Sequence, residues 1–497
     1  METIYGALRK YADSDAYPFH MPGHKRTTGW MTDPFQIDIT EIDGFDNLHC
    51  AEGIILEAQK RAAKLYGADE SFFLVNGSTA GILSAISSCV KKDGKILMAR
   101  NSHKSAYHAV FLKNLDVVYL YPKTIQEYGI NGGYAPEEIE KILDSDDEIE
   151  AVFLTSPTYD GIVSDIKEIA RIVHSHKIPL IVDEAHGAHF GMAEGFPKSA
   201  VENGADIVIQ SLHKTLPSLT QTAILHRNGN RTDRDRLMRY LQIYQTSSPS
   251  YIFMAAMDEC LTQIKRNGEM IFQDFRKNLL AFREDTKDLK VIHIPSEELK
   301  GKDGVFDFDP SKLILSVRES QKSGKWLMER LREEFHLELE MACGDYALAM
   351  TSVCDRKEGF QRLSDALHQI DIQLCEEKKN LNKEENKEEN KEENKEENKE
   401  ENKEDEILFS LQKMECAARI GQMEEEEMER VGWENCAGRI AGEYAYLYPP
   451  GIPLIVPGEI ITEGLIKQIA YYRKRRFRIQ GLSDDSGNTL RVSSKRM

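Results

Sequence analysis

Between residues 71 and 226 the chain alternates short apolar runs, rich in β-branched residues, with segments of helical pattern. This alternation is typical of a parallel sheet, whose strands are buried on both faces because the crossover helices cover them. We therefore predict a doubly wound α/β domain, a fold that binds ligands at the carboxyl ends of its strands. The expected strands are 95–99, 116–121, 151–155, 178–183, 206–210 and 222–226.

The rest of the chain divides by pattern into smaller units. Its 497 residues suggest about three domains. Residues 376–405 form a charged low-complexity linker that contains the repeat NKEE; it has almost no apolar side chains to bury in a core, and either a charged helix or a disordered tether fits it. We predict an N-terminal segment (1–70), a large ligand-binding domain (71–260), a small α+β domain (261–375) and a C-terminal domain (406–497).

The charge balance excludes some classes of protein. The net charge is −19, part of it from the NKEE run, with its six lysines and twelve acidic residues. An acidic chain is a poor coat for nucleic acid, and the basic run 473–478 is typical of a solvated helix end. We see no secretory signal, no membrane-spanning apolar stretch and no CxxC pair among eight cysteines. We therefore expect a cytoplasmic protein with reduced thiols, no metal, and neither nucleic acid nor membrane as a partner.

Lys214 is the strongest chemical candidate. It follows a buried-looking strand in QSLHKTLPS, with Ser211 and His213 as flanking donors. Burial lowers the pKa of a lysine, and the neutral amine can attack an aldehyde to form a Schiff base. An ordinary loop lysine is the alternative.

Asp183 ends an apolar run in LIVDEAHGAHFG. A carboxylate placed there needs a partner, because burying a lone charge is costly, and a protonated pyridine nitrogen would serve. The letters DEAH also occur in helicases, but none of the Gly-Lys pairs is followed by the Ser or Thr of a phosphate loop. A metal site at His186 and His189 lacks further ligands.

Two further segments follow strands. Gly77, Ser78 and Thr79 open a helical pattern, where free N–H groups and the helix dipole favour a phosphate, although a simple helix cap is the alternative. His103 follows strand 95–99 and could lie flat on an aromatic ring, although a structural hydrogen-bonding role is more common for a lone histidine.

In chain order these segments resemble fold-type I pyridoxal phosphate enzymes, and more closely the short form of the bacterial ornithine/lysine/arginine decarboxylase family. The resemblance spans nearly the whole chain, and the NKEE insertion touches none of its motifs. The residues that carry it are PFHMPGHK (18–25), NGSTAGI (76–82), RNSHKS (100–105), SPTYDGI (156–162), VDEAHGAH (182–189), SLHK (211–214), TSSPSY (246–251) and YPPGIPLIVPGEIIT (448–462).

This resemblance implies pyridoxal 5'-phosphate as cofactor and gives each residue a role. Lys214 would bond to the cofactor and Asp183 would pair with its pyridine nitrogen. His103 and Ala185 would line the two faces of the ring, with His186 nearby. The phosphate would be held by Gly77, Ser78, Thr79, Ser211 and His213, and by Ser247 or Ser248 of a partner subunit in a homodimer.

The implied reaction is α-decarboxylation of a basic amino acid to a polyamine-type amine, with Lys214 or His213 returning a proton to Cα. Glu459 is the candidate partner for the cationic end of the substrate. We favour arginine over lysine or ornithine. An aminotransferase that uses Arg318 or Arg332, or a non-catalytic cofactor-binding regulator, are the alternatives.

Overall fold

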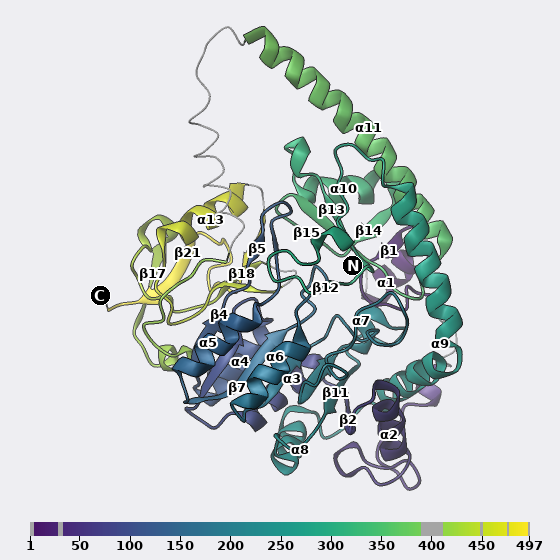
Figure 1. Ribbon diagram of the computed structural model, residues 1–497, viewed down its shortest axis with the longest axis vertical. Coiled ribbons are helices and arrows are strands. Elements are labelled where there is room, and N and C mark those ends of the chain that lie inside the picture. The colour runs from purple at the N-terminus through teal and green to yellow at the C-terminus, as the bar shows by residue number, and fades with distance from the viewer. Residues whose placement is uncertain (1–3, 28–32, 389–410, 448–450, 475–476, 496–497) are drawn as a thin grey trace.

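A seven-stranded sheet forms the centre of the protein, in a computed structural model that describes residues 4–27, 33–388, 411–447, 451–474 and 477–495 (Figure 1). The strand order is β2-β11-β10-β9-β7-β3-β4, and β11 runs antiparallel to both of its neighbours. All six expected strands are present, and β2 is a seventh that we did not predict. The strands are β2 (Glu70–Leu74), β3 (Lys95–Ala99), β4 (Asp116–Leu120), β7 (Ile149–Thr155), β9 (Leu180–Asp183), β10 (Ile207–Gln210) and β11 (Ala223–Arg227).

Helices cover both faces of this sheet. Side chains alternate across a strand, so Ile96 and Met98 of β3 pack on one face while Leu97 and Ala99 pack on the other. The first face is covered by α3 (Gly77–Cys89), α4 (Lys104–Lys113) and α8 (Arg234–Tyr244), and the second by α5 (Pro136–Ser145) and α6 (Ile166–Ser175). This is the predicted doubly wound domain.

The N-terminal segment contributes to two domains. Its strand β1 (Tyr17–Phe19) pairs in parallel with β14 (Leu337–Leu339), which lies more than three hundred residues later in the small domain. Its helix α2 (Ile54–Tyr66) packs instead on β2 and α9 (Tyr251–Asp285). The segment also contains α1 (Ile4–Ala12), η1 (Pro34–Gln36) and η2 (Leu48–Cys50).

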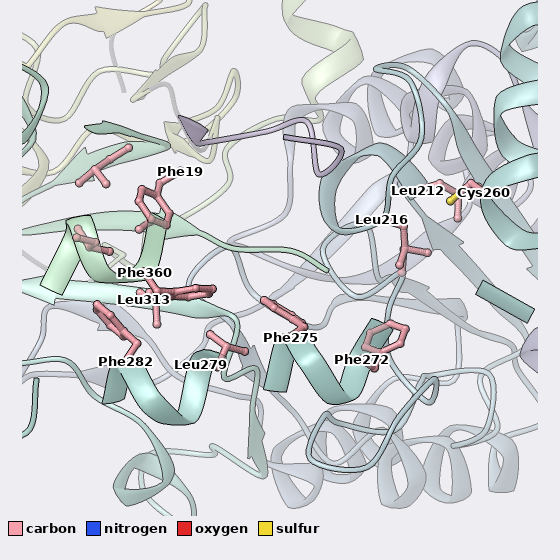
Figure 2. Packing of buried hydrophobic residues seen from close by; sticks show 14 of the residues in the cluster. Phe19, Leu212, Leu216, Cys260, Phe272, Phe275, Leu279, Phe282, Leu313 and Phe360 are labelled. Carbon is pink, nitrogen blue, oxygen red and sulfur yellow. The ribbon is translucent and has the colours of Figure 1, made fainter. Parts of the chain in front are cut away.

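Two long helices border the small domain. Helix α9 crosses the predicted boundary at residue 260, and α11 (Lys357–Glu388) continues into the first part of the predicted linker (Figure 1). The remaining copies of NKEE lie outside the described residues. Figure 2 shows the core between these elements, in which Phe282 of α9 and Phe19 of β1 both contact Phe360 of α11. The sheet of this domain has the order β13-β16-β15, formed by β13 (Lys312–Ser316), β16 (Tyr346–Met350) and β15 (Met341–Cys343), with α10 (Gly324–Phe335) beside it.

The C-terminal domain lies on the opposite side of the molecule from α9 (Figure 1). It has its own hydrophobic core around Trp433, Ile455 and Leu490. Its elements are η5 (Ile420–Glu424), β17 (Met428–Gly432), η6 (Trp433–Asn435), β18 (Ala445–Leu447), β19 (Pro453–Ile455), α13 (Glu463–Lys474), β20 (Ile479–Gln480) and β21 (Thr489–Ser493).

Short elements complete the structure: β5 (Thr124–Ile125), β6 (Ile130–Asn131), β8 (Ile162–Val163), α7 (Leu212–Thr215), η3 (Glu297–Leu299), β12 (Asp307–Phe308) and η4 (Arg318–Ser320). In the described part of the chain, no helix is long and apolar enough to cross a bilayer. All eight cysteines are free thiols.

Candidate active site

A cavity of about 440 Å³ lies at the carboxyl ends of the parallel strands. Asp183 ends β9, Thr155 ends β7, and Lys214 lies in the short helix α7 that follows β10. Because parallel strands end at one edge of the sheet, residues far apart in sequence meet there. The predicted residues that line the cavity are Gly77, Ser78, Thr79, His103, Asp183, Ala185, His186, His213 and Lys214.

The start of α3 forms one wall of this cavity. Gly77 has a φ of +73°, which favours glycine, and Ser78 and Thr79 follow in the first turn. The N-cap residue Asn76 makes no side-chain hydrogen bond to the helix, because its Oδ1 accepts from the backbone N–H of Thr246. The helix start is therefore free to hold an anionic group through backbone N–H and hydroxyl donors.

His103 and Ala185 also line the cavity, with His103 at the N-cap of α4. The Nδ1 atom of His103 lies 2.8 Å from the hydroxyl of Ser105 and accepts from the Ser105 backbone N–H, which fixes the ring. Burial and the charge of Lys214 lower the pKa of His103 to about 3. The ring is therefore neutral and offers a flat surface for a planar ligand.

Asp183 is a buried carboxylate that accepts one hydrogen bond among the described residues, from the backbone N–H of Ala185 at 3.1 Å. Burial raises the pKa of Asp183, and the charge of Lys214 opposes this effect. A carboxylate in this position can still accept from a protonated ring nitrogen in the cavity, because it can accept several hydrogen bonds.

The amine of Lys214 lies 3.0 Å from Nε2 of His186. Burial lowers the pKa of Lys214, whereas Asp183 and Glu340 raise it. Burial and the charges of Lys214 and Lys312 hold the pKa of His186 well below its usual value, so the imidazole is neutral. This environment favours a neutral, nucleophilic amine.

Ser211 and His213 flank Lys214 in different ways. Ser211 lies beside the cavity rather than in its lining, and its buried Oγ has no hydrogen-bond partner among the described residues. An unsatisfied buried hydroxyl is costly, so this atom fits a ligand contact. His213 lines the cavity and its Nδ1 donates to the carbonyl oxygen of Thr222 at 2.9 Å.

Glu459, the predicted contact for the cationic end of the substrate, lies away from the cavity. Glu459 is fully buried in the C-terminal domain, does not line the cavity, and binds the guanidinium of Arg100 through both carboxylate oxygens at 3.1 and 3.0 Å. One of these oxygens also accepts from the Val456 backbone N–H at 2.9 Å. The carboxylate therefore serves a structural ion pair.

Other candidates also lie outside the cavity. Ser247 and Ser248 are exposed on the loop between α8 and α9. Arg318 lies in η4 and Arg332 in α10, and neither lines the cavity. An aminotransferase would need one of them there to bind the carboxylate of its substrate. His189 lies 3.2 Å from the carboxylate of Asp309.

Sequence reasoning missed several lining residues, including Thr155, Tyr159 and Asp160. Thr155 has a buried Oγ1 without a hydrogen-bond partner among the described residues, and Asp160 accepts from the hydroxyl of Tyr346 at 2.7 Å. A usable signal was present, because all three lie at or just after the carboxyl end of an expected strand.

Comparison with known proteins identifies the family of the chain. The family model for the major domain of Orn/Lys/Arg decarboxylases matches residues 3–322, and that for the C-terminal domain matches residues 401–481. An arginine decarboxylase of Bacillus subtilis is 30% identical, over 98% of this chain and 97% of its own length. An arginine decarboxylase of Halalkalibacterium halodurans is also 30% identical, with the same coverage.

Solved structures show the same fold. The lysine decarboxylase LdcF of Francisella novicida superposes with a TM-score of 0.77 over 98% of this chain and 80% of its own, at 19% identity. A ureidoglycine-glyoxylate aminotransferase of Bacillus subtilis has a TM-score of 0.52 over 65% of this chain and 85% of its own. The large domain has the predicted fold of fold-type I pyridoxal phosphate enzymes. The chain belongs to the Orn/Lys/Arg decarboxylase family.

Proposed function

We propose that this protein is a pyridoxal phosphate-dependent decarboxylase of a basic amino acid. The observation that carries the proposal is that one cavity brings together the amine of Lys214, the buried carboxylate of Asp183 and the uncapped start of α3. Family membership supports the reaction class.

The three features of the cavity correspond to the three functional parts of the cofactor. Gly77, Ser78, Thr79, Ser211 and His213 would hold its phosphate, His103 and Ala185 its ring faces, Asp183 its ring nitrogen and Lys214 its aldehyde. When bound to an amino acid, the cofactor supplies an electron-withdrawing ring that stabilises the charge left at Cα after CO₂ departs.

Lys214 is the better candidate for returning a proton to Cα. His213 donates its Nδ1 proton to the Thr222 carbonyl, and burial lowers the pKa of His213 to about 4. At neutral pH the Nε2 atom of His213 therefore carries no proton to give. Lys214 can take up and release a proton because burial lowers its pKa.

We propose Asp160, in place of Glu459, as the contact for the cationic end of the substrate. Asp160 and Asp183 are the two carboxylates in the lining of the cavity among the described residues. Burial raises the pKa of Asp160 to about 6, so it is ionised at neutral pH and fits a cation.

Arginine is the substrate that we favour, because the full-length relatives are named arginine decarboxylases. The test is release of CO₂ from arginine, lysine and ornithine with added pyridoxal phosphate. We expect the highest kcat/KM with arginine and an amine as the product. A keto-acid product, or cofactor binding without turnover, would refute the proposal.

We also propose a homodimer, in which Ser247 or Ser248 reaches the phosphate of the partner. Apolar side chains are exposed around the 34–54 segment, among them Phe35, Phe45 and Ile54. Phe45 and Ile54 line a hollow together with Ile37, Tyr251 and Met254, among others. A second copy of this chain would remove this apolar surface from water. Sedimentation of Phe45→Asp should give a monomer with weakened cofactor binding, and a monomeric parent protein would refute the proposal.

We propose that the protein is located in the cytoplasm. We also propose that its role is to supply a polyamine-type amine. Free thiols, of which the chain has eight, persist in reducing compartments. Cell fractionation, together with amine measurement in a deletion strain, tests both.

A further inference from the structure

A second lysine lies behind the cavity, on the far side of His186. Lys312 is the first residue of β13 and is fully buried. It does not line the cavity, and its stem packs under Gly161, where an added Cβ would come within 2.7 Å of Lys312 Cγ. The small domain therefore places an amine against the catalytic edge of the large domain.

His186 connects the two lysines. Its Nε2 lies 3.0 Å from Lys214 Nζ, and its Nδ1 lies 3.3 Å from Lys312 Nζ. The ring of Tyr159 packs against the imidazole at 4.5 Å between centroids. Lys214, His186 and Lys312 thus form one hydrogen-bonded relay from the cavity to the small domain.

The chemistry of imidazole couples the charges of the two amines. A neutral imidazole has one N–H and one lone pair, whereas an ammonium group can only donate. His186 is neutral, so it can accept from one lysine and must donate to the other. The lysine that accepts this hydrogen bond is a neutral amine. At least one of the two lysines is therefore neutral, and the bonding allows only one of them to be charged at a time.

Charged groups surround both lysines of the Lys214–His186–Lys312 relay. Burial lowers the pKa of Lys312 to about 8; Asp309 and Glu340 oppose this, and Lys214 and Lys25 add to it. Lys312 also acts on the carboxyl group of Asp160. At the other end, Lys214 is faced by Asp183, Glu340, His103 and His213. Burial is thus the largest influence on both amines, and it disfavours the charged form of each.

We propose that Lys312 is a positioning residue which, through His186, keeps Lys214 as the neutral amine. The inference rests on the proposed function of Lys214. In the step, the Lys214 proton passes to Nε2 of His186 while the Nδ1 proton of the same ring passes to Lys312 Nζ. One proton leaves each donor and one arrives at each acceptor, so the three side chains together keep a single positive charge. Lys214 is thereby ready to attack a carbonyl.

The test measures the titration of Lys214 in the full-length chain freed of cofactor. Trace acetylation with acetic anhydride at a series of pH values, followed by peptide mass spectrometry, gives the midpoint for Lys214. In Lys312→Met we expect this midpoint to rise by about one pH unit, so that labelling at neutral pH is about tenfold slower. An unchanged midpoint would overturn the proposal.

A double-mutant cycle separates the relay from simple charge repulsion. His186→Phe should raise the midpoint as Lys312→Met does, and the double variant should show no further rise, because either change breaks the same chain. Additive shifts would mean that Lys312 acts through space and would refute the relay.

Two controls make the result interpretable. Lys113→Met removes a buried lysine bonded to Tyr240, outside the cavity, and should leave the Lys214 midpoint unchanged. Should Lys312→Met not fold, Lys312→Gln removes the charge with a polar side chain and carries the same expectation. Cofactor that binds without bonding to Lys214 in the parent protein would refute the proposed function, whereas an unchanged midpoint with that bond intact would refute only the relay.

Discussion

Two buried carboxylates near the carboxyl end of the sheet differ in how fully they are bonded. Glu459 accepts from the guanidinium of Arg100 with both oxygens and from the Val456 backbone N–H. Asp183 accepts one backbone N–H, from Ala185, and faces the cavity. Both side chains are buried beside a cationic residue, so residue type and burial do not separate them. What separates them is that one is fully bonded by protein and the other retains capacity for a ligand.

The largest expected effect is at Lys214, the cationic residue beside the incompletely bonded carboxylate of Asp183. Lys214→Ala should lower CO₂ release by about four orders of magnitude or more, because the attacking amine is lost. The visible absorbance of lysine-bound cofactor should disappear while circular dichroism is unchanged. Lys113→Ala, which removes another buried lysine, should keep kcat. Persistence of the absorbance band in Lys214→Ala would show that another residue binds the aldehyde.

A change at Glu459, the fully bonded carboxylate, should lower the free energy of unfolding rather than the activity. Glu459→Gln leaves Arg100 buried without its carboxylate, which costs about 3–5 kcal/mol in the free energy of unfolding. Urea unfolding measures this loss, and kcat per folded molecule should stay near that of the parent.

Asp183→Asn is the matched control for that experiment. It should change the free energy of unfolding by only about 1 kcal/mol, because Asp183 accepts one hydrogen bond among the described residues and burial already disfavours its charge. It should instead lower kcat. Equal stability losses in Glu459→Gln and Asp183→Asn would contradict the distinction between the two carboxylates.

A smaller effect is expected at Asp160. Asp160→Asn should raise KM for the basic amino acid by about 10- to 100-fold, because it removes the charge that faces the cationic end. Cofactor affinity should not change, which separates a substrate contact from damage to the cavity. An unchanged KM would show that Asp160 does not bind the cationic end of the substrate.

The smallest expected effect concerns acid stability. The pKa of His103 is about 3 in the fold against 6.5 without it, so between these values the unfolded chain binds a proton that the folded chain does not. Stability therefore falls as pH decreases through this window. His103→Gln should reduce the slope by up to about 1 kcal/mol per pH unit, measured by urea unfolding.

His226 offers a matched comparison away from the cavity. Burial lowers its pKa to about 3 as well, and it bonds Ser71 and Gln210 in the core. His226→Gln should therefore flatten the same pH window while the kcat of the folded enzyme is kept. A slope that changes in neither variant would contradict the assignment of neutral histidines.

Much of the large domain was predictable because its signals are local. Apolar runs such as 178–183 define strands by themselves, and a residue that directly follows such a run lies at the ligand-binding edge by the geometry of parallel sheets. Asp183 and Lys214 were found in this way, whereas the Gly77–Thr79 turn was found because it opens a helical pattern; all of them line the cavity. β1 was not found, because three residues give no periodicity and their partner strand lies in another domain.

The sequence by itself determined the α/β alternation, the order of the chemical residues along it and the resemblance to a decarboxylase family. Only the tertiary structure decided which charges are paired. Glu459 contacts Arg100 although 359 residues separate them in the sequence, and Lys312 contacts His186 across a separation of 126 residues. No local pattern encodes such contacts. The physical reason is that strand and helix patterns reflect nearest neighbours along the chain, whereas the bonding of a buried charge depends on how separate domains pack together.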